Sequence, residues 1–220
     1  MSLEIERKYL GAGREHLLAQ LKSYGAKQTL APHFESNTVY DNEQGTLLHD
    51  RRLLRLRRRE WPDHADGLLT CKIPMEDLVL ATGPVKRREE IEISLHTLSD
   101  IRNMDRILKE LGYHPAGSYE KVRESWRLEV EGRSAHMDMD LLPFTETVEI
   151  EADPATLELV EHLLGLDKFP TSAKSYHVLY LEWLANKGLP ANNYMVFTDD
   201  ERARLRKELG LSLSGSHESA

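Results

Sequence analysis

The stretch Glu4-Ile5-Glu6-Arg7-Lys8 places three charged side chains on one side of an extended strand, because strand side chains alternate with period two. The same arrangement recurs along the chain, with a mostly apolar residue between two charged ones: Arg55 and Arg57, Glu90 and Glu92, Lys121 and Arg123, Asp138 and Asp140, Glu149 and Glu151. The pattern predicts a sheet with one apolar face and one face that carries charges of both signs.

Alternating segments and segments with helical spacing together indicate an α+β protein with a mostly antiparallel sheet. We expect strands at about 3–10, 34–40, 52–60, 68–73, 86–95, 118–130, 135–141 and 146–152. Apolar stripes predict helices at about 14–24, 99–111, 154–164 and 172–186. Two architectures suit this pattern: a tube with charge inside and helices outside, or an open sheet with cross-strand ion pairs facing water.

Composition limits the classes of function. The chain has 220 residues and a net charge of −8, which argues against a general nucleic-acid binder or a binder of anionic membranes. Cys71 is the only cysteine, so an intrachain disulfide is excluded. No apolar run approaches the roughly 20 residues that a membrane helix needs, and charge appears at once after Met1. We therefore expect a cytoplasmic protein with a small-molecule partner.

The mixture of charges on one sheet face suggests a site for a metal and a polyanion. Clustered carboxylates repel one another unless a cation joins them, and Mg²⁺ or Mn²⁺ prefers their oxygen atoms as ligands. Arginine and lysine match phosphate oxygens, as a bidentate fork and as a point charge respectively. The sequence contains no glycine-rich loop of the P-loop type, so phosphate binding at a helix terminus is not expected.

Several motifs, in their order along residues 1–185, resemble those of the CYTH family, which joins class IV adenylate cyclases and thiamine triphosphatases among the triphosphate tunnel metalloenzymes. They are Glu4-Ile5-Glu6-Arg7-Lys8, Leu54-Arg55-Leu56-Arg57, Thr70-Cys71-Lys72, Arg88-Glu89-Glu90-Ile91-Glu92, Glu120-Lys121-Val122-Arg123, Val148-Glu149-Ile150-Glu151 and Lys174-Ser175-Tyr176. The resemblance implies an eight-stranded antiparallel β-barrel or tunnel with a charged interior and helices packed outside.

The resemblance also implies roles for particular residues. The metal, Mg²⁺ or Mn²⁺, would be held by Glu4, Glu6, Glu90, Glu92, Asp140, Glu149 and Glu151. The triphosphate would be bound by Lys8, Arg55, Arg57, Lys72, Arg88, Lys121, Arg123 and Lys174. Glu4, Glu6, Lys8 and Lys72 are the residues expected to act in catalysis.

Three functions remain open on the sequence. The first is conversion of ATP to cyclic AMP and pyrophosphate, because Leu142-Pro143-Phe144 and the segment 107–115 are more similar to the class IV cyclase branch. The second is hydrolysis of tripolyphosphate or of a thiamine or nucleoside triphosphate, and the third is a non-catalytic polyphosphate or nucleotide binding module. We expect a tunnel domain at 1–187, an extension at 188–220 with a helix at about 199–209 and a disordered end, and possible homodimers.

Overall fold

The computed structural model describes residues 5–74, 78–80, 83–85 and 88–211, and the side chains of residues 6–74 and 89–211. These residues form two compact units, each assembled from separate stretches of the chain. Unit 1 contains residues 1–33 and 121–199, and unit 2 contains residues 34–120 and 200–220. The long strands β2 (Lys27–Asp41) and β8 (His114–Val130) contribute residues to both units.

Unit 1 is a sheet whose apolar face packs against α1 (Arg14–Ser23) and α4 (Pro154–Leu163). Its further elements are β1 (Ile5–Leu10), α1 (Arg14–Ser23), β9 (Arg133–Leu142), β10 (Thr145–Ala152), α4 (Pro154–Leu163), β11 (Thr171–Ser172), α5 (Tyr176–Asn186) and β12 (Tyr194–Met195). The apolar strand residues Tyr9, Met137 and Ile150 are at most 1% exposed and share one core with Leu17 of α1 and Leu157 of α4. Their charged neighbours in sequence therefore lie on the opposite face.

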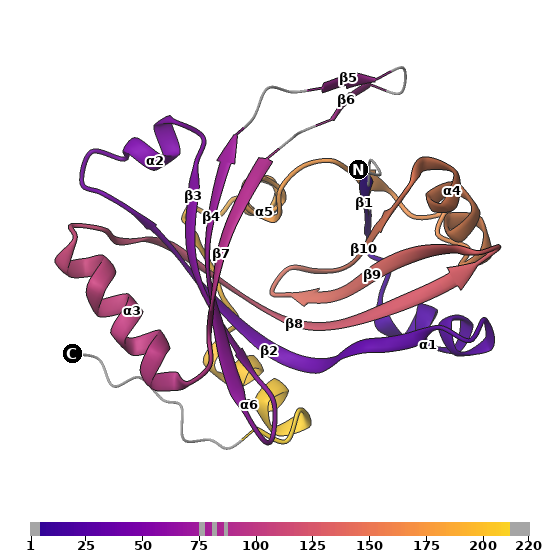
Figure 1. Ribbon diagram of the computed structural model, residues 1–220, viewed down its shortest axis with the longest axis horizontal. Helices are drawn as coiled ribbons and strands as arrows, with labels where there is room; N and C mark the ends of the chain where they lie inside the picture. The colour runs from indigo at the N-terminus through magenta and orange to yellow at the C-terminus, as the bar shows by residue number, and fades with distance from the viewer. Residues whose placement is uncertain (1–4, 75–77, 81–82, 86–87, 212–220) are drawn as a thin grey trace. The chain divides into compact units, whose positions relative to one another are not determined.

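Unit 2 has a smaller core beneath one amphipathic helix. Its further elements are α2 (Thr46–His49), β3 (Leu53–Glu60), β4 (Ala65–Pro74), β5 (Leu78–Leu80), β6 (Gly83–Val85), β7 (Arg88–Leu95), α3 (Leu98–Glu110) and α6 (Asp199–Glu208). Thr97 and Asp100 form a capping box that begins α3, and the helix packs along β3, β4 and β7 (Figure 1). Ile101 and Leu108 of α3 are buried with Leu56.

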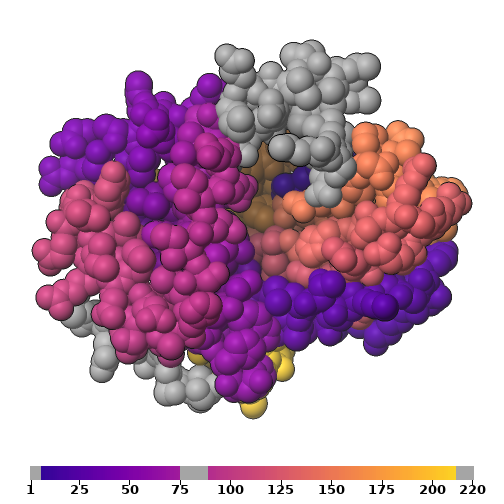
Figure 2. Space-filling model, in the orientation of Figure 1, coloured from indigo at the N-terminus to yellow at the C-terminus, as the bar shows by residue number. Residues whose placement is uncertain are grey.

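The apolar face of unit 2 is only partly covered. Ile91 and Ile93 of β7 are 51% and 52% exposed, although they pair with Cys71 and Leu69 on the face that α3 covers. Ile107 and Leu111 are also exposed, and part of α3 lies at the surface in Figure 2. Strand alternation thus placed Ile91 and Ile93 on the expected apolar face, but helix coverage of that face is incomplete.

The main sheet is antiparallel in every strand pair whose register is resolved, which confirms the α+β class, but its strand number differs from the expected eight. Among the described residues it has ten strands, with β12 beside β8 and the others in the order β11-β1-β10-β9-β8-β2-β3-β4-β7. Within the part of the chain that the structure describes, this hydrogen-bonded path is open, so the expected closed barrel was wrong in this respect. The additional members include β11 and β12, which have two residues each and are too short for a periodic signal.

Helix α6 is held to unit 2 by ion pairs. Arg206 donates to both carboxylate oxygens of Glu60, at 2.8 and 3.1 Å, and Arg202 donates to Glu120 at 2.9 Å. Burial opposes ionisation of Glu60, but Arg206 and Arg58 outweigh it and lower the pKa of this carboxyl. Among the described residues, no helix combines the length and apolar character needed to cross a membrane.

Candidate active site

The charged face of unit 1 is organised in rows across its strands. One row joins Lys8, Glu149, Asp138 and Ser125, which are successive register partners on β1, β10, β9 and β8. Directly opposed residues in antiparallel strands have neighbouring side chains on the same face. Strand pairing, more than any single loop, therefore assembles this cluster.

Lys8 lies among carboxylates at one end of the row. Its ammonium group is 2.8 Å from Glu149 Oε1 and donates to Glu6 Oε1 at 3.2 Å. Burial raises the pKa of Glu6 to about 7 and the neighbouring Glu149 charge adds to the effect, although water screens part of it because the side chain is 48% exposed. Burial opposes ionisation of Glu149, but Arg123 and Lys8 lower its pKa to about 2.

Asp140 is the buried anion of the cluster. Arg123 binds it through two parallel hydrogen bonds of 2.6 and 2.5 Å, and the Lys121 ammonium donates to it at 3.2 Å. The Asp140 side chain is 0% exposed and that of Lys121 is 3% exposed. Arg123 also donates to Glu149 at 3.0 Å and pairs with Asp138, so it connects the row to Asp140.

Asp138 is held in its charged form. Burial raises the pKa of this carboxyl, but hydrogen bonding to His136 and the Arg123 charge outweigh burial and lower it well below its usual range. Ser125 also donates to Asp138, at 2.6 Å. The hydrogen bond to Asp138 in turn raises the pKa of His136.

Tyr176, the first residue of α5, enters the same cluster. Its phenol donates to Asp140 at 2.8 Å and lies 2.9 Å from the Thr147 hydroxyl. Its ring centroid is 4.7 Å from the Lys8 ammonium and 5.8 Å from the Lys121 ammonium. Burial, reinforced by the charge of Asp140, raises the pKa of Tyr176 well above its usual value, so the phenol remains a donor.

Unit 2 carries its own basic group, centred on Arg55 of β3. The guanidinium donates to Tyr119 Oη at 2.9 Å and to Thr70 Oγ1 at 3.3 Å, and Thr70 donates to Glu92 at 2.9 Å. Arg55 is 7% exposed, and its Nε atom is buried without a hydrogen-bond partner. No carboxylate among the described residues lies within ion-pair distance of this guanidinium, which is therefore a buried cation whose described hydrogen-bond partners are neutral.

Two other predicted basic residues of unit 2 have acidic partners. Arg57 donates to Asn37 at 3.1 Å and lies 3.5 Å from Glu35, while Lys72 donates to Glu90 at 2.6 Å. The register of β3, β4 and β7 places Arg55, Thr70 and Glu92 in one row. The predicted residues of this unit therefore share a sheet face as expected.

Four further residues were predicted for the site, namely Glu4, Arg88, Glu151 and Lys174. Glu4 and the side chain of Arg88 lie outside the part of the chain that the structure describes. Glu151 is the register partner of Glu6 and is exposed. Lys174 directs its ammonium group to Glu182 at 2.5 Å, whereas its backbone carbonyl accepts from Lys8 at 3.4 Å.

The carboxylates of unit 1 have the chemistry that Mg²⁺ or Mn²⁺ requires. The residues with described side chains contain no ready-made group of three ligands, but Mg²⁺ is commonly held by one or two carboxylates together with water and substrate phosphates. Burial, with the Glu149 charge as a second cause, raises the pKa of Glu6, so a cation beside these two carboxylates would favour the ionised form of Glu6. The donor set therefore fits such a metal.

Sequence reasoning missed the hydroxyl-bearing residues of the unit 1 cluster and of the basic group around Arg55. These are Thr70, Tyr119, Ser125, Thr147 and Tyr176. Tyr176 was part of the quoted motif Lys174-Ser175-Tyr176, so the motif contained the signal but the lysine was chosen instead. Thr70 was likewise part of the quoted motif Thr70-Cys71-Lys72. Neutral hydroxyl groups give no distinct charge pattern along a strand, and Tyr119, Ser125 and Thr147 had no such signal.

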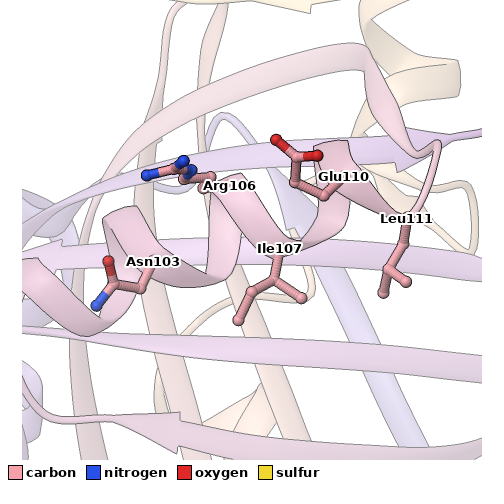
Figure 3. Close-up of a pocket in the computed structure, with 5 residues that line it drawn as sticks. All are labelled: Asn103, Arg106, Ile107, Glu110 and Leu111. Atoms are coloured by element: carbon pink, nitrogen blue, oxygen red, sulfur yellow. The ribbon is translucent and has the colours of Figure 1, made fainter.

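A cavity of about 430 Å³ lies elsewhere in unit 2, along α3. Its lining residues are Asn103, Arg106, Ile107, Glu110 and Leu111, and Figure 3 shows Ile107 and Leu111 pointing to the side of the helix opposite Arg106 and Glu110. None of the predicted site residues lines it. We therefore place the candidate active site on the charged sheet faces and not in this cavity.

The antiparallel sheet carries acidic and basic side chains together within its rows, and comparison with known families identifies the class of protein. The chain belongs to the CYTH domain family, whose model matches residues 2–167. Among curated proteins, none matches this sequence.

Solved structures share the fold at low identity. A candidate adenylate cyclase from Vibrio parahaemolyticus has a TM-score of 0.59 at 20% identity, covering 81% of this chain and 98% of its own. The PH1819 protein from Pyrococcus horikoshii has a TM-score of 0.60 at 20% identity, with coverages of 82% and 99%. HpAC1 from Hippeastrum, a candidate adenylyl cyclase described as having a dominant triphosphatase activity, has a TM-score of 0.53 at 19% identity, with coverages of 87% and 98%.

Proposed function

We propose that this protein is a divalent-metal-dependent enzyme that acts on a triphosphate, with cyclisation of ATP to cyclic AMP and pyrophosphate as the first candidate reaction. The observation that carries the proposal is Arg55, a buried guanidinium whose described partners are neutral. Burying an unpaired charge costs free energy, and a phosphate group would supply the missing anion in a geometry suited to a guanidinium.

The cluster of unit 1 supports binding of a metal together with a polyanion. Its cations Lys8, Lys121 and Arg123 are already paired with carboxylates, so an anion alone would have to compete with them. A divalent cation bound to the carboxylates would neutralise phosphate charge and lower the pKa of a coordinated water. The basic groups would then be available to hold phosphate oxygens and to stabilise charge that develops in the transition state.

The two candidate reactions differ in the nucleophile. In cyclisation, the ribose 3′-hydroxyl attacks the α-phosphorus and pyrophosphate leaves. In hydrolysis, water attacks and orthophosphate is released. The stated triphosphatase activity of HpAC1, a structure similar to this chain, supports hydrolysis as the second candidate.

One assay separates these possibilities. The purified chain is incubated with Mg²⁺ or Mn²⁺ and, separately, with ATP, thiamine triphosphate or tripolyphosphate, and the products are resolved by chromatography. Cyclic AMP with pyrophosphate establishes the cyclase, and orthophosphate establishes the triphosphatase. If none of the substrates is consumed but tripolyphosphate binds, the chain is a binding module and the proposed enzyme activity is wrong.

A further inference from the structure

We infer that Tyr176 is a positioning residue of the anion site, and this inference rests on the proposed function. Tyr176 lies beyond the region matched by the family model, which ends at residue 167. Its hydroxyl and ring contact three charged residues of the cluster, namely Lys8, Lys121 and Asp140. The segment after residue 167 thus completes the site that the preceding strands begin.

The hydroxyl of Tyr176 fixes the buried carboxylate. Its single proton is donated to Asp140 Oδ2 at 2.8 Å, so Thr147, at 2.9 Å, is the donor of the second hydrogen bond. The same carboxylate oxygen accepts from Lys121 at 3.2 Å. A neutral donor satisfies Asp140 without adding charge, and it constrains the carboxylate to which Lys121 and Arg123 are bound.

The ring of Tyr176 acts on the two lysines directly. Ammonium groups near an aromatic face are attracted by its quadrupole, and the 4.7 Å distance from Lys8 is well inside the range for this interaction. Lys8 is also held by the Lys174 carbonyl at 3.4 Å, which belongs to the same turn. Ser175 caps α5 by accepting from Val178, and this cap fixes the start of the helix and the direction of Tyr176.

Two substitutions separate the roles of the hydroxyl and the ring. Tyr176→Phe removes only the hydrogen bonds to Asp140 and Thr147, whereas Tyr176→Leu also removes the ring from Lys8 and Lys121. We expect the Kd for tripolyphosphate, measured by calorimetry on the full chain, to rise about fivefold in the first variant and about thirtyfold in the second. If the wild type turns over a triphosphate, KM should rise by similar factors while kcat changes by less than about threefold.

Tyr180 provides the matched control, because it lies on the same helix and is buried. Its hydroxyl donates to the Tyr194 carbonyl at 3.2 Å and has no contact with the cluster among its described interactions. Tyr180→Phe and Tyr180→Leu should alter thermal stability but leave the Kd for tripolyphosphate within about twofold of the wild type. Equal weakening by Tyr180→Leu and Tyr176→Leu would show a merely structural effect and overturn the inference.

A spectroscopic readout tests the placement without any ligand. The ring should shift the ε-methylene proton resonances of Lys8 and Lys121 upfield, and the shift should persist in Tyr176→Phe and disappear in Tyr176→Leu. Absence of this change, or wild-type affinity in Tyr176→Leu, overturns the inference. A wild type that binds tripolyphosphate without turnover refutes only the enzyme proposal, whereas one that binds none refutes both.

Discussion

Asp140→Asn should destabilise the protein strongly, because Asp140 is the buried anion to which Lys121 and Arg123 are both bound. Four hydrogen bonds reach its carboxylate, one from Lys121, two from Arg123 and one from Tyr176. The asparagine side chain keeps the shape of the carboxylate but removes its charge. Its NH2 group would also face at least one of the groups that donate to Asp140. Lys121, with a side chain only 3% exposed, would lose the ionised carboxylate to which it donates at 3.2 Å.

The magnitude follows from the burial of both partners. Removal of one partner from a buried ion pair costs about 3–5 kcal/mol, which for a chain of this size corresponds to a fall in Tm of roughly 10 °C. The free energy of unfolding is measured by urea denaturation of wild type and variant. The control is Glu208→Gln, since Glu208 and Arg204 form a pair with side chains 56% and 60% exposed; this change should cost less than about 0.5 kcal/mol.

A second variant distinguishes loss of the ion pair from a general loss of packing. Lys121→Met removes the buried cation, so combining it with Asp140→Asn should cost less than the sum of the two single changes, by about 1–3 kcal/mol. A cost below about 1 kcal/mol for Asp140→Asn, or strict additivity in the double variant, would refute the view that these two side chains form a buried pair.

Three further predictions concern other parts of the molecule. Glu149→Gln removes a charge 2.8 Å from Lys8, so calorimetry should show that metal-free tripolyphosphate binds as well as before or more tightly. Turnover should fall at least a hundredfold, and retained turnover would contradict the role of this carboxylate. The pKa of Glu60 is lowered in the folded state, so ionised Glu60 stabilises the fold above its ordinary pKa of 4.5, and this effect is lost as the pH falls through the lower folded pKa. Urea midpoints should therefore show that Arg206→Met costs stability at pH 7 but little in acid. Leu108→Ala should cost about 2–5 kcal/mol and Leu111→Ala less than about 0.5, because these residues of one apolar stripe are 6% and 67% exposed, and equal thermal shifts would contradict the described placement of α3.

The sequence predicted the charged sheet faces well, because alternation in a strand depends only on backbone geometry. Lys8 and Tyr9 illustrate this, since the first joins the charged cluster and the second the core. Strand register could not be predicted in this way, because it depends on pairing between segments that are distant in sequence. No local pattern indicates that Lys8 opposes Glu149 and that Glu149 opposes Asp138.

Lys174 was assigned to the triphosphate by resemblance, and the observed start of α5 explains why Tyr176 lies in the cluster instead. The apolar spacing predicted a helix from about 172, whereas the helix begins at Tyr176 after the Ser175 cap. Side chains on a helix turn by about 100° per residue, so a difference of a few residues in its start changes which of them faces the sheet. In the structure the Lys174 ammonium binds Glu182, and Tyr176 occupies the cluster.

The density of buried charge in unit 1 favours a functional explanation over a structural one. Ion pairs taken out of water gain little net stability, and apolar side chains of similar volume often serve the core equally well. The opposite face of the same strands shows that this chain can fill such positions with Tyr9, Met137 and Ile150. Pure anion binding would need Lys8, Lys121 and Arg123 but not the carboxylates that neutralise them, whereas a site for a metal and a polyphosphate needs both sets in contact.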